Sequence, residues 1–220
     1  MAKISPTKPM LIMPYGYPGS GKTHFAAQFA EFVKCANLNA EALRQEVFEK
    51  PSFNNREDEV VERLMRFQTE EFLRAGVSVI YDADLVRLGH RRQLQAIARH
   101  HHCAALVIWF QIDTEAAFLR VAKRDRRTNE DKNSRPLDRT GFDDYLKQMQ
   151  NPKLEEYVVL SGKHTFNTQK SAVIKKMYEM GLISADNASS QVIKPGLVNL
   201  VPQQLRAGRV DETRRNIVIR

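Results

Sequence analysis

Short apolar runs alternate with stretches of helical periodicity along the first 180 residues, and this alternation predicts an α/β fold. Strands are predicted at five apolar segments: 10–13, 35–40, 77–82, 104–112 and 157–160. Between the strands, apolar residues recur every three or four positions, which predicts helices over 24–33, 41 to near Pro51, 56–74, 88–101, 114–124, 142–149 and 172–180. Strands and helices in this order are typical of a mostly parallel sheet with right-handed crossovers. We therefore expect a three-layer sandwich around five strands.

The helix over 56–74 has the clearest pattern, and Gly76 ends it. We assign its large apolar residues to one buried face: Val60, Val61, Leu64, Met65, Phe67, Phe72 and Leu73. In the next helical region, Asp113 is in position to cap the helix that begins at Thr114.

The pattern breaks at 125–140, where a charged run contains a single apolar side chain and cannot be core. This segment is either a lid over a site at the sheet edge or an ordinary charged loop. We expect a core over 1–152 that includes this lid. Residues 153–220 then supply the last strand and helix and a C-terminal extension, with a possible edge strand at 216–219.

Composition narrows the class of protein. With 220 residues, 42% of them hydrophobic, the chain suits one α/β domain with an appendage. The longest apolar run, 104–110, is too short to span a bilayer, and the N-terminus has no signal-peptide core, so we expect a cytoplasmic protein that binds no membrane. Cys35 and Cys103 are expected to be reduced thiols, with no disulfide-linked partner and no metal-ligand spacing.

The net charge of +8 comes from 34 Lys and Arg against 26 Asp and Glu. It suits a partner that carries phosphates, either a nucleotide or a nucleic acid, and it also suits a solvated basic surface.

The strongest motif is Gly16-Tyr17-Pro18-Gly19-Ser20-Gly21-Lys22-Thr23, a G-x-x-x-x-G-K-[ST] phosphate-binding loop between the first strand and the first helix. Its glycines let backbone N–H groups converge on a phosphate, while Lys22 reaches the β/γ oxygens and the Thr23 hydroxyl ligates magnesium. The motif predicts binding of ATP with Mg²⁺. The residues assigned to the nucleotide here are Gly16, Pro18, Gly19, Ser20, Gly21, Lys22, Thr23 and His24.

Two acidic residues close the third strand. Asp82 stands where a carboxylate holds magnesium beside a phosphate loop, although a strand-terminal acid can also be a plain cap. Asp84 is in position either to contact a substrate or to cap the next helix.

Further charged pairs flank these motifs. Arg120 and Arg124 lie four residues apart on one helix face, where they would clamp the γ-phosphate or simply form a basic helix end. Glu41 and Arg44 follow the second strand, where a carboxylate can take the proton of an attacking hydroxyl and an arginine can hold an acceptor phosphate; both could equally be solvated. The run His100-His101-His102 is interpreted as a frayed helix end, because consecutive histidines do not converge on one ion.

Together these segments resemble the P-loop kinase family that includes phage-type polynucleotide 5′-hydroxyl kinases and zeta-toxin-like and AAA-type small ATPases. The resemblance covers residues 10 to about 152. It rests on the phosphate loop and three further segments: 39–44, Asp82-Ala83-Asp84 with Arg91-Arg92, and Arg120-Val121-Ala122-Lys123-Arg124. It implies a P-loop NTPase fold of the kinase type. It also implies Glu41 as base, where the family normally has Asp, with Arg44, Asp84 and Arg91 as substrate contacts and Arg124 as transition-state ligand.

We therefore expect an ATP-dependent phosphotransferase in which Lys22, Glu41, Asp82 and Arg124 are catalytic and the acceptor is the 5′-hydroxyl of a nucleic acid. A nucleoside, a sugar nucleotide or an antibiotic hydroxyl are the competing acceptors. A regulatory ATP-binding module that uses its C-terminal extension for a protein partner is the alternative of another class. A GTP switch is disfavoured because the chain has no Asn-Lys-x-Asp motif, and a ring-forming mechanoenzyme because it lacks an extra helical domain.

Overall fold

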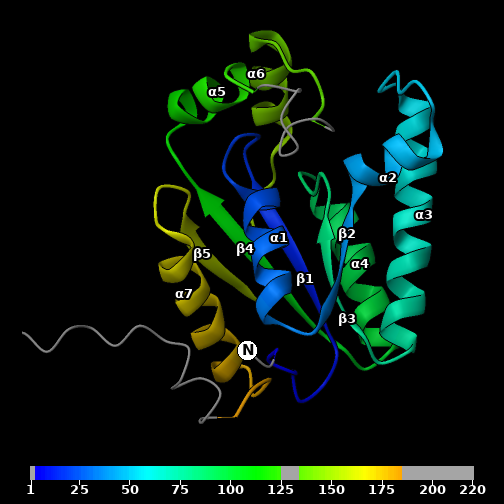
Figure 1. The fold of residues 1–220 in the computed structure, drawn as a ribbon, viewed down its shortest axis with the longest axis vertical. Coiled ribbons are helices and arrows are strands. Elements are labelled where there is room, and N and C mark those ends of the chain that lie inside the picture. Colours follow the sequence, from blue (N-terminus) through cyan, green and yellow to red (C-terminus); the bar gives the residue numbers. More distant parts are fainter. Residues whose placement is uncertain (1–2, 125–133, 185–220) are drawn as a thin grey trace, which may run out of the picture.

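A five-stranded parallel sheet forms the centre of the structure, a computed structural model that describes residues 3–124 and 134–184 (Figure 1). Its strands are β1 (Met10–Gly16), β2 (Cys35–Asn39), β3 (Ser78–Asp82), β4 (Ala104–Gln111) and β5 (Tyr157–Ser161). They lie in the order β2-β3-β1-β4-β5, and every neighbouring pair is parallel. The predicted parallel sheet of five strands is confirmed.

Strand β1 occupies the middle of the sheet, and all seven of its residues are buried. Its side chains alternate between the two faces, so that Met10 and Ile12 join one core while Leu11, Met13 and Tyr15 join the other. A strand covered on both faces must be apolar nearly throughout, which is why this run stood out in the sequence.

Four helices cover the two faces and make the sandwich three-layered (Figure 1). Helices α1 (Lys22–Phe32) and α7 (Phe166–Glu179) pack on one face, where the Phe25 ring stacks on Phe29 and meets Phe110 edge-on. Helices α3 (Asn55–Arg74) and α4 (Leu88–His100) pack on the other. These layers hold the carboxyl ends of all five strands at one edge.

Three shorter helices lie toward that edge: α2 (Ala40–Val47), α5 (Thr114–Ala122) and α6 (Arg139–Gln148). Each begins at a side-chain cap, in which Asn39, Asp113 or Asp138 accepts a backbone N–H at 2.7–2.9 Å. The expected capping by Asp113 is confirmed. Phe142 of α6 is buried against Phe118 of α5, and this contact joins the two helices.

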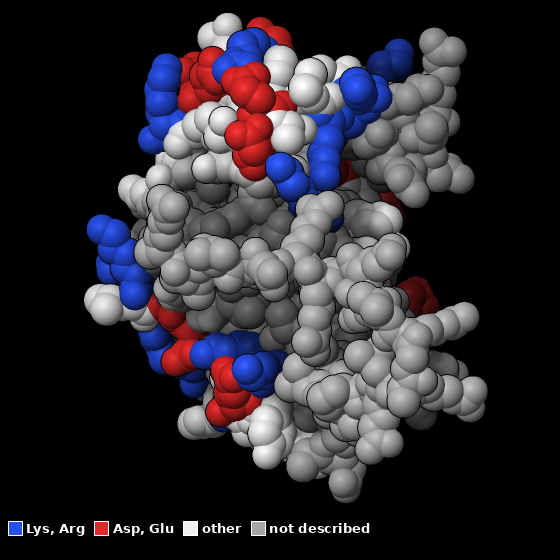
Figure 2. All heavy atoms as spheres, turned by 90° about the vertical axis from the view of Figure 1, so that its left-hand side faces the viewer, with Lys and Arg blue, Asp and Glu red and all other residues white. Residues whose placement is uncertain are grey.

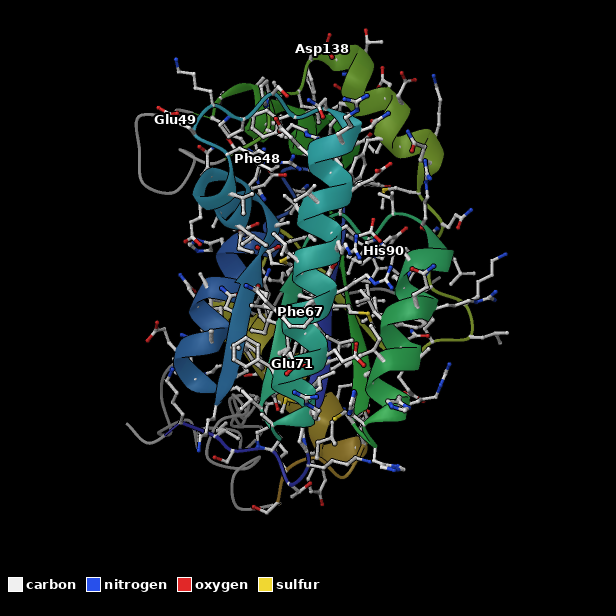
Figure 3. The ribbon with its side chains drawn as sticks, turned by 90° about the vertical axis from the view of Figure 1, so that its right-hand side faces the viewer. Phe48, Glu49, Phe67, Glu71, His90 and Asp138 are labelled. Atoms are coloured by element: carbon white, nitrogen blue, oxygen red, sulfur yellow. The ribbon has the colours of Figure 1, made fainter. Side chains whose placement is uncertain are left out.

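Helix α3 corrects one prediction. Its buried stripe is Val61, Met65, Thr69 and Leu73, at four-residue spacing. Phe67 is 62% exposed and Val60 43%, because seven-residue spacing puts both on the outward side of this stripe; Phe67 projects from the outer surface of α3 in Figure 3. Phe72 is also exposed. The predicted buried face over 56–74 was therefore wrong in including Val60, Phe67 and Phe72.

Helix α7 begins at Phe166, six residues before the predicted start at 172. The first turns are polar in sequence, yet Gln169 and Lys170 are both buried. The Gln169 amide donates to the Ser161 carbonyl at 2.8 Å, and the Lys170 ammonium lies 4.1 Å from the centre of the Phe32 ring. Polar residues that pack this way leave no apolar periodicity for a sequence to reveal.

Residues 125–133 of the expected lid and the whole segment 185–220, with the edge strand expected at 216–219, lie outside the described residues. Among the helices of 3–124 and 134–184, none combines the length and the apolar character that crossing a membrane requires.

Candidate active site

The phosphate loop turns sharply between β1 and α1, and its backbone explains why glycine stands at two of its positions. Gly16 has φ of 151° and Gly19 has φ of 80°, values that residues with a side chain rarely adopt. A Cβ atom on Gly16 would lie 2.6 Å from the Phe110 carbonyl oxygen, and one on Gly19 would lie 2.4 Å from that of Ala117. The loop is therefore pressed against β4 on one side and α5 on the other.

The loop ends at the N-terminus of α1, which no side chain caps. Helices α2, α3, α5 and α6 each have an Asn or Asp cap there, whereas α1, like α4 and α7, has none. The N-terminus of α1 directly follows the loop, where its N–H groups and its dipole favour an anion. Ser20 is buried, and its hydroxyl has no hydrogen-bond partner among the described residues. Both observations fit a loop built to receive a phosphate.

Lys22 folds back over the same loop. Its ammonium donates to the carbonyl oxygens of Gly16 at 2.8 Å and Tyr17 at 3.0 Å. Burial lowers the pKa of Lys22, while the nearby carboxylates of Asp84 and Asp82 oppose that shift. A desolvated ammonium held at the mouth of the loop is suited to binding phosphate oxygens. Of the remaining loop residues, Pro18 is half-buried, whereas Thr23 and His24 are exposed at the start of α1.

Asp82 ends β3 beside Lys22 and is buried. Its Oδ2 accepts from the Asn39 amide at 2.6 Å. Burial raises the Asp82 pKa, and hydrogen bonds from Asn39 and Thr23 oppose that shift. A carboxylate bonded to the Thr23 hydroxyl is the donor set that magnesium prefers, so these two residues fit a Mg²⁺ ion bound with a nucleotide.

The two arginines after β4 lie on the phosphate-loop side. Arg120 donates to the carbonyl of Gly162 at 3.0 Å and to that of Gly19 at 3.4 Å. Arg124 is half-buried just beyond α5, and its charge lowers the Lys22 pKa. The structure therefore brings both close to the loop.

A cavity of about 260 Å³ opens next to Asp82 and Asp84, between α2, α3 and the start of α4. Glu41 and Arg44 of α2 line it. Burial raises the Glu41 pKa, with the neighbouring Asp84 adding to the shift and Arg44 opposing it. A carboxylate with a raised pKa at a cavity wall is suited to accepting a proton.

Arg44 is only 3% exposed, and carboxylates surround it. Its guanidinium group pairs with Glu41 (3.4 Å), Glu57 (3.3 Å) and Asp58. Donors from Ser52 and the Phe53 backbone also converge on Glu57 and lower its pKa to about 2. The solvated arginine considered from the sequence is wrong, because this side chain is the centre of a buried ion-pair network.

Asp84 does not cap α4, which begins four residues later, at Leu88, without a side-chain cap. Instead its Oδ1 accepts from the Tyr145 hydroxyl of α6 at 2.9 Å, and that hydroxyl also lies 3.5 Å from the Gly16 carbonyl oxygen. Tyr145 therefore joins the phosphate loop to the acidic turn after β3.

Arg91 lies elsewhere. It is fully buried beneath Tyr15, with its guanidinium carbon 4.6 Å from the ring centre. Each of its nitrogens donates inside the fold, to Glu155 (2.8 Å) and to the carbonyls of Leu85 and Gln150 (both 2.7 Å). Arg91 does not line the cavity, and its guanidinium donors within the described residues are engaged by Glu155, Leu85 and Gln150. The structure therefore gives no support to the substrate contact predicted for Arg91.

Three residues that the sequence analysis did not assign belong to the site: Asn39, Arg135 and Tyr145. Arg135 donates to Asp58 at 2.6 Å and to the Phe53 carbonyl at 3.2 Å, and it lines the cavity. Asn39 caps α2 and bonds to Asp82 with the same side chain. The position of Asn39, directly after a strand and before a helix, was a usable signal, whereas nothing in the sequence singles out the other two.

Solved structures with a similar fold include several kinases. A gluconokinase from Sinorhizobium meliloti 1021 has a TM-score of 0.58 and 14% identity, over 83% of this chain and 97% of that one. Kti12 from Chaetomium thermophilum in complex with ADP-AlF3 has a TM-score of 0.59 and 18% identity, over 79% of this chain and 99% of that one. A chain of the Pnkp1/Rnl/Hen1 RNA repair complex has a TM-score of 0.51 and 22% identity, over 67% of this chain and 45% of that one.

These likenesses show that the fold is the α/β P-loop kinase-like fold. No curated protein matches the chain. The family model described as an AAA domain matches residues 11–152, from β1 through α6. Because this match covers more than half of the sequence, the chain belongs to the AAA domain family.

Proposed function

We propose that the protein is an ATP-dependent phosphotransferase, which moves the γ-phosphate of ATP to a hydroxyl group of an acceptor bound in the cavity beside Glu41. The observation that carries this proposal is the position of Asp84 between the phosphate loop, which would bind the donor ATP, and the cavity, which would bind the acceptor. Asp84 lines the cavity together with Glu41, and its Oδ1 accepts from the Tyr145 hydroxyl, which lies 3.5 Å from the Gly16 carbonyl oxygen of the phosphate loop. A donor phosphate and an acceptor hydroxyl would therefore be close neighbours.

On the donor side, the backbone N–H groups of the loop, the Ser20 hydroxyl and the Lys22 ammonium hold the phosphates of ATP. Thr23 and Asp82 would hold Mg²⁺, which supplies neutralisation of phosphate charge when it is bound. Arg120 and Arg124 approach from α5 and stabilise the charge on the transferring phosphoryl group. Most of the rate enhancement in this chemistry comes from such positioning and electrostatics.

On the acceptor side, Glu41 takes the proton of the attacking hydroxyl. The hydroxyl oxygen forms a bond to the γ-phosphorus, the bond to the β–γ bridging oxygen breaks, and its electron pair leaves with ADP. Arg44 positions Glu41 through their ion pair (3.4 Å). The buried network around Arg44 supports this role, because it restricts the rotation of both side chains.

Two kinds of acceptor are consistent with this chemistry. The resemblance to polynucleotide kinases and the net charge of +8 favour the 5′-hydroxyl of a nucleic acid. The similar fold of a gluconokinase favours a small hydroxylated molecule.

The test is transfer of label from [γ-³³P]ATP to a 5′-hydroxyl oligonucleotide, and in parallel to a panel of sugars and nucleosides, with Lys22→Ala as control. Label on any acceptor that disappears in Lys22→Ala supports the proposal. Label found only in inorganic phosphate, at equal rates with and without acceptors, would instead favour a regulatory ATP-binding module.

A further inference from the structure

Among the described residues, the lining of the cavity beside Glu41 carries more carboxylates than guanidinium groups. Its acidic residues are Glu41, Asp58, Glu62 and Asp84, and its arginines are Arg44, Arg87 and Arg135. The excess of one negative charge is unusual for a site that would bind a phosphorylated acceptor, because such a site needs cations in excess.

The arginines are also engaged already. Arg44 pairs with Glu57 and Asp58, and Arg135 donates to Asp58 at 2.6 Å. Arg87, at the outer edge, donates to the neutral amide oxygen of Gln148 at 3.4 Å. An acceptor phosphate would have to compete with Asp58 for two of these three groups and would be repelled by the same carboxylate.

Around the cavity, other basic side chains are likewise paired with carboxylates. A wider hollow of about 600 Å³ adjoins it and shares Glu62, Arg87 and His90; its Lys147 bonds to Asp144 at 2.8 Å. Away from the cavity, over α5 and α6, acidic and basic side chains lie next to one another (Figure 2), and Arg139 pairs with Glu115 and Asp143.

Two polar atoms in the cavity wall are unsatisfied. The Tyr81 hydroxyl and His90 Nε2 are each buried and have no hydrogen-bond partner among the described residues. Figure 3 shows His90 in the space between α3 and α4. A buried polar atom without a partner is costly, and a ligand that supplies the missing partner removes that cost.

The chemistry of these atoms indicates what the missing partner is. The His90 ring bonds to the backbone of Asp84 through its other nitrogen, and burial lowers its pKa and favours the neutral ring. Nε2 is then an acceptor, and it lies 3.4 Å from a second acceptor, Oε1 of Glu62. Two acceptors side by side call for a donor between them, which a ligand hydroxyl provides.

We propose that the acceptor is a small molecule rich in hydroxyl groups and free of phosphate and carboxylate, such as a sugar or a nucleoside, and that Tyr81 and His90 select it by hydrogen bonding. This inference rests on the proposed phosphotransfer. The volume of about 260 Å³ is close to the lower end of the range of ligand pockets, roughly 300–1,000 Å³, and so suits a small acceptor.

The experiment compares matched acceptors on the full chain with [γ-³³P]ATP: glucose with glucose 6-phosphate, adenosine with adenosine 3′-phosphate, and a 5′-hydroxyl oligonucleotide. Uncharged members are expected to be labelled at the higher kcat/KM. Tyr81→Phe and His90→Gln are each expected to raise the KM of the acceptor about tenfold and to leave the KM of ATP unchanged. Tyr157→Phe and His100→Gln, which change exposed side chains far from the cavity, are the controls.

The outcomes separate this inference from the proposed function. Higher kcat/KM on the phosphorylated members or on the oligonucleotide would overturn the inference while leaving phosphotransfer intact. Equal acceptor KM values in Tyr81→Phe, His90→Gln and the two controls would overturn the role of these side chains. Label on none of the acceptors would overturn the proposed function, and the inference with it.

Discussion

The donor side and the acceptor side of the site are built in different ways. Eight consecutive residues, 16–23, form the phosphate loop, and their conformation depends on local glycines and on close contact with β4 and α5. The cavity around Glu41 takes its side chains from α2, α3, β3, the start of α4 and the segment before α6. A motif encodes the first in one stretch of chain, whereas the second exists only after the layers have packed.

Arg91 offers the largest expected effect, and it tests whether that residue belongs to the acceptor side at all. Arg91→Ala would leave the buried Glu155 carboxylate without its cationic partner and with the neutral Gln95 amide as a donor, so we expect a loss of about 3–5 kcal/mol in the free energy of unfolding. Urea denaturation followed by circular dichroism measures it, with exposed Arg74→Ala as control. If the Arg91→Ala protein were as stable as the wild type and had lost only its affinity for the acceptor, Arg91 would be a substrate-binding residue after all.

Lys22→Ala tests the donor side. Removing an ammonium that contacts the phosphates should lower turnover on the order of 10²–10³-fold, because a group aimed at developing charge is lost. The melting temperature should stay close to that of the wild type, since within the described part of the chain the Lys22 ammonium donates to two loop carbonyls. Steady-state kinetics with Lys34→Ala as control make the comparison, and turnover within twofold of the wild type would contradict the assigned role.

Glu41 tests the acceptor side through pH. The base acts when it is deprotonated, so kcat/KM should rise with pH through the Glu41 pKa, and burial puts that pKa above the ordinary value of 4.5. Glu41→Gln should lower the rate about 10²-fold and remove this acidic limb. A pH profile of the variant that kept the limb would assign it to another group.

Asn39→Ala is expected to have the smallest effect on stability and activity. It changes both the donor side, through Asp82, and the acceptor side, through helix α2. The cap of α2 is lost, at a cost of about 1 kcal/mol, and Asp82 loses the amide that bonds to it. Without that bond the Asp82 pKa should rise further, so the Mg²⁺ concentration for half-maximal activity should increase more at pH 6 than at pH 8. Asn54→Ala, which removes the cap of α3 and a hydrogen bond to the Ser52 hydroxyl but no bond to Asp82, is the control.

The strands and the phosphate loop could be predicted from sequence because each is a local pattern, and the parallel character of the sheet followed from the alternation of strands and helices. Val60 and Phe67 were misplaced because periodicity alone does not fix which stripe of a long helix meets the sheet. Of the residues predicted for the acceptor side, Glu41, Arg44 and Asp84 line the cavity, whereas Arg91 does not. The partners Glu57, Asp58 and Arg135 come from distant segments, and only the packed structure brings their charges together.

The most direct test of the account is the fate of the γ-phosphate. The ratio of labelled acceptor to labelled inorganic phosphate should be measured with a hydroxyl acceptor present, for the wild type and for Glu41→Gln. The account predicts that the wild type labels the acceptor and that Glu41→Gln loses this label while it still binds ATP. Release of inorganic phosphate alone, at the same rate in both proteins, would contradict a phosphotransfer site between the phosphate loop and the Glu41 cavity.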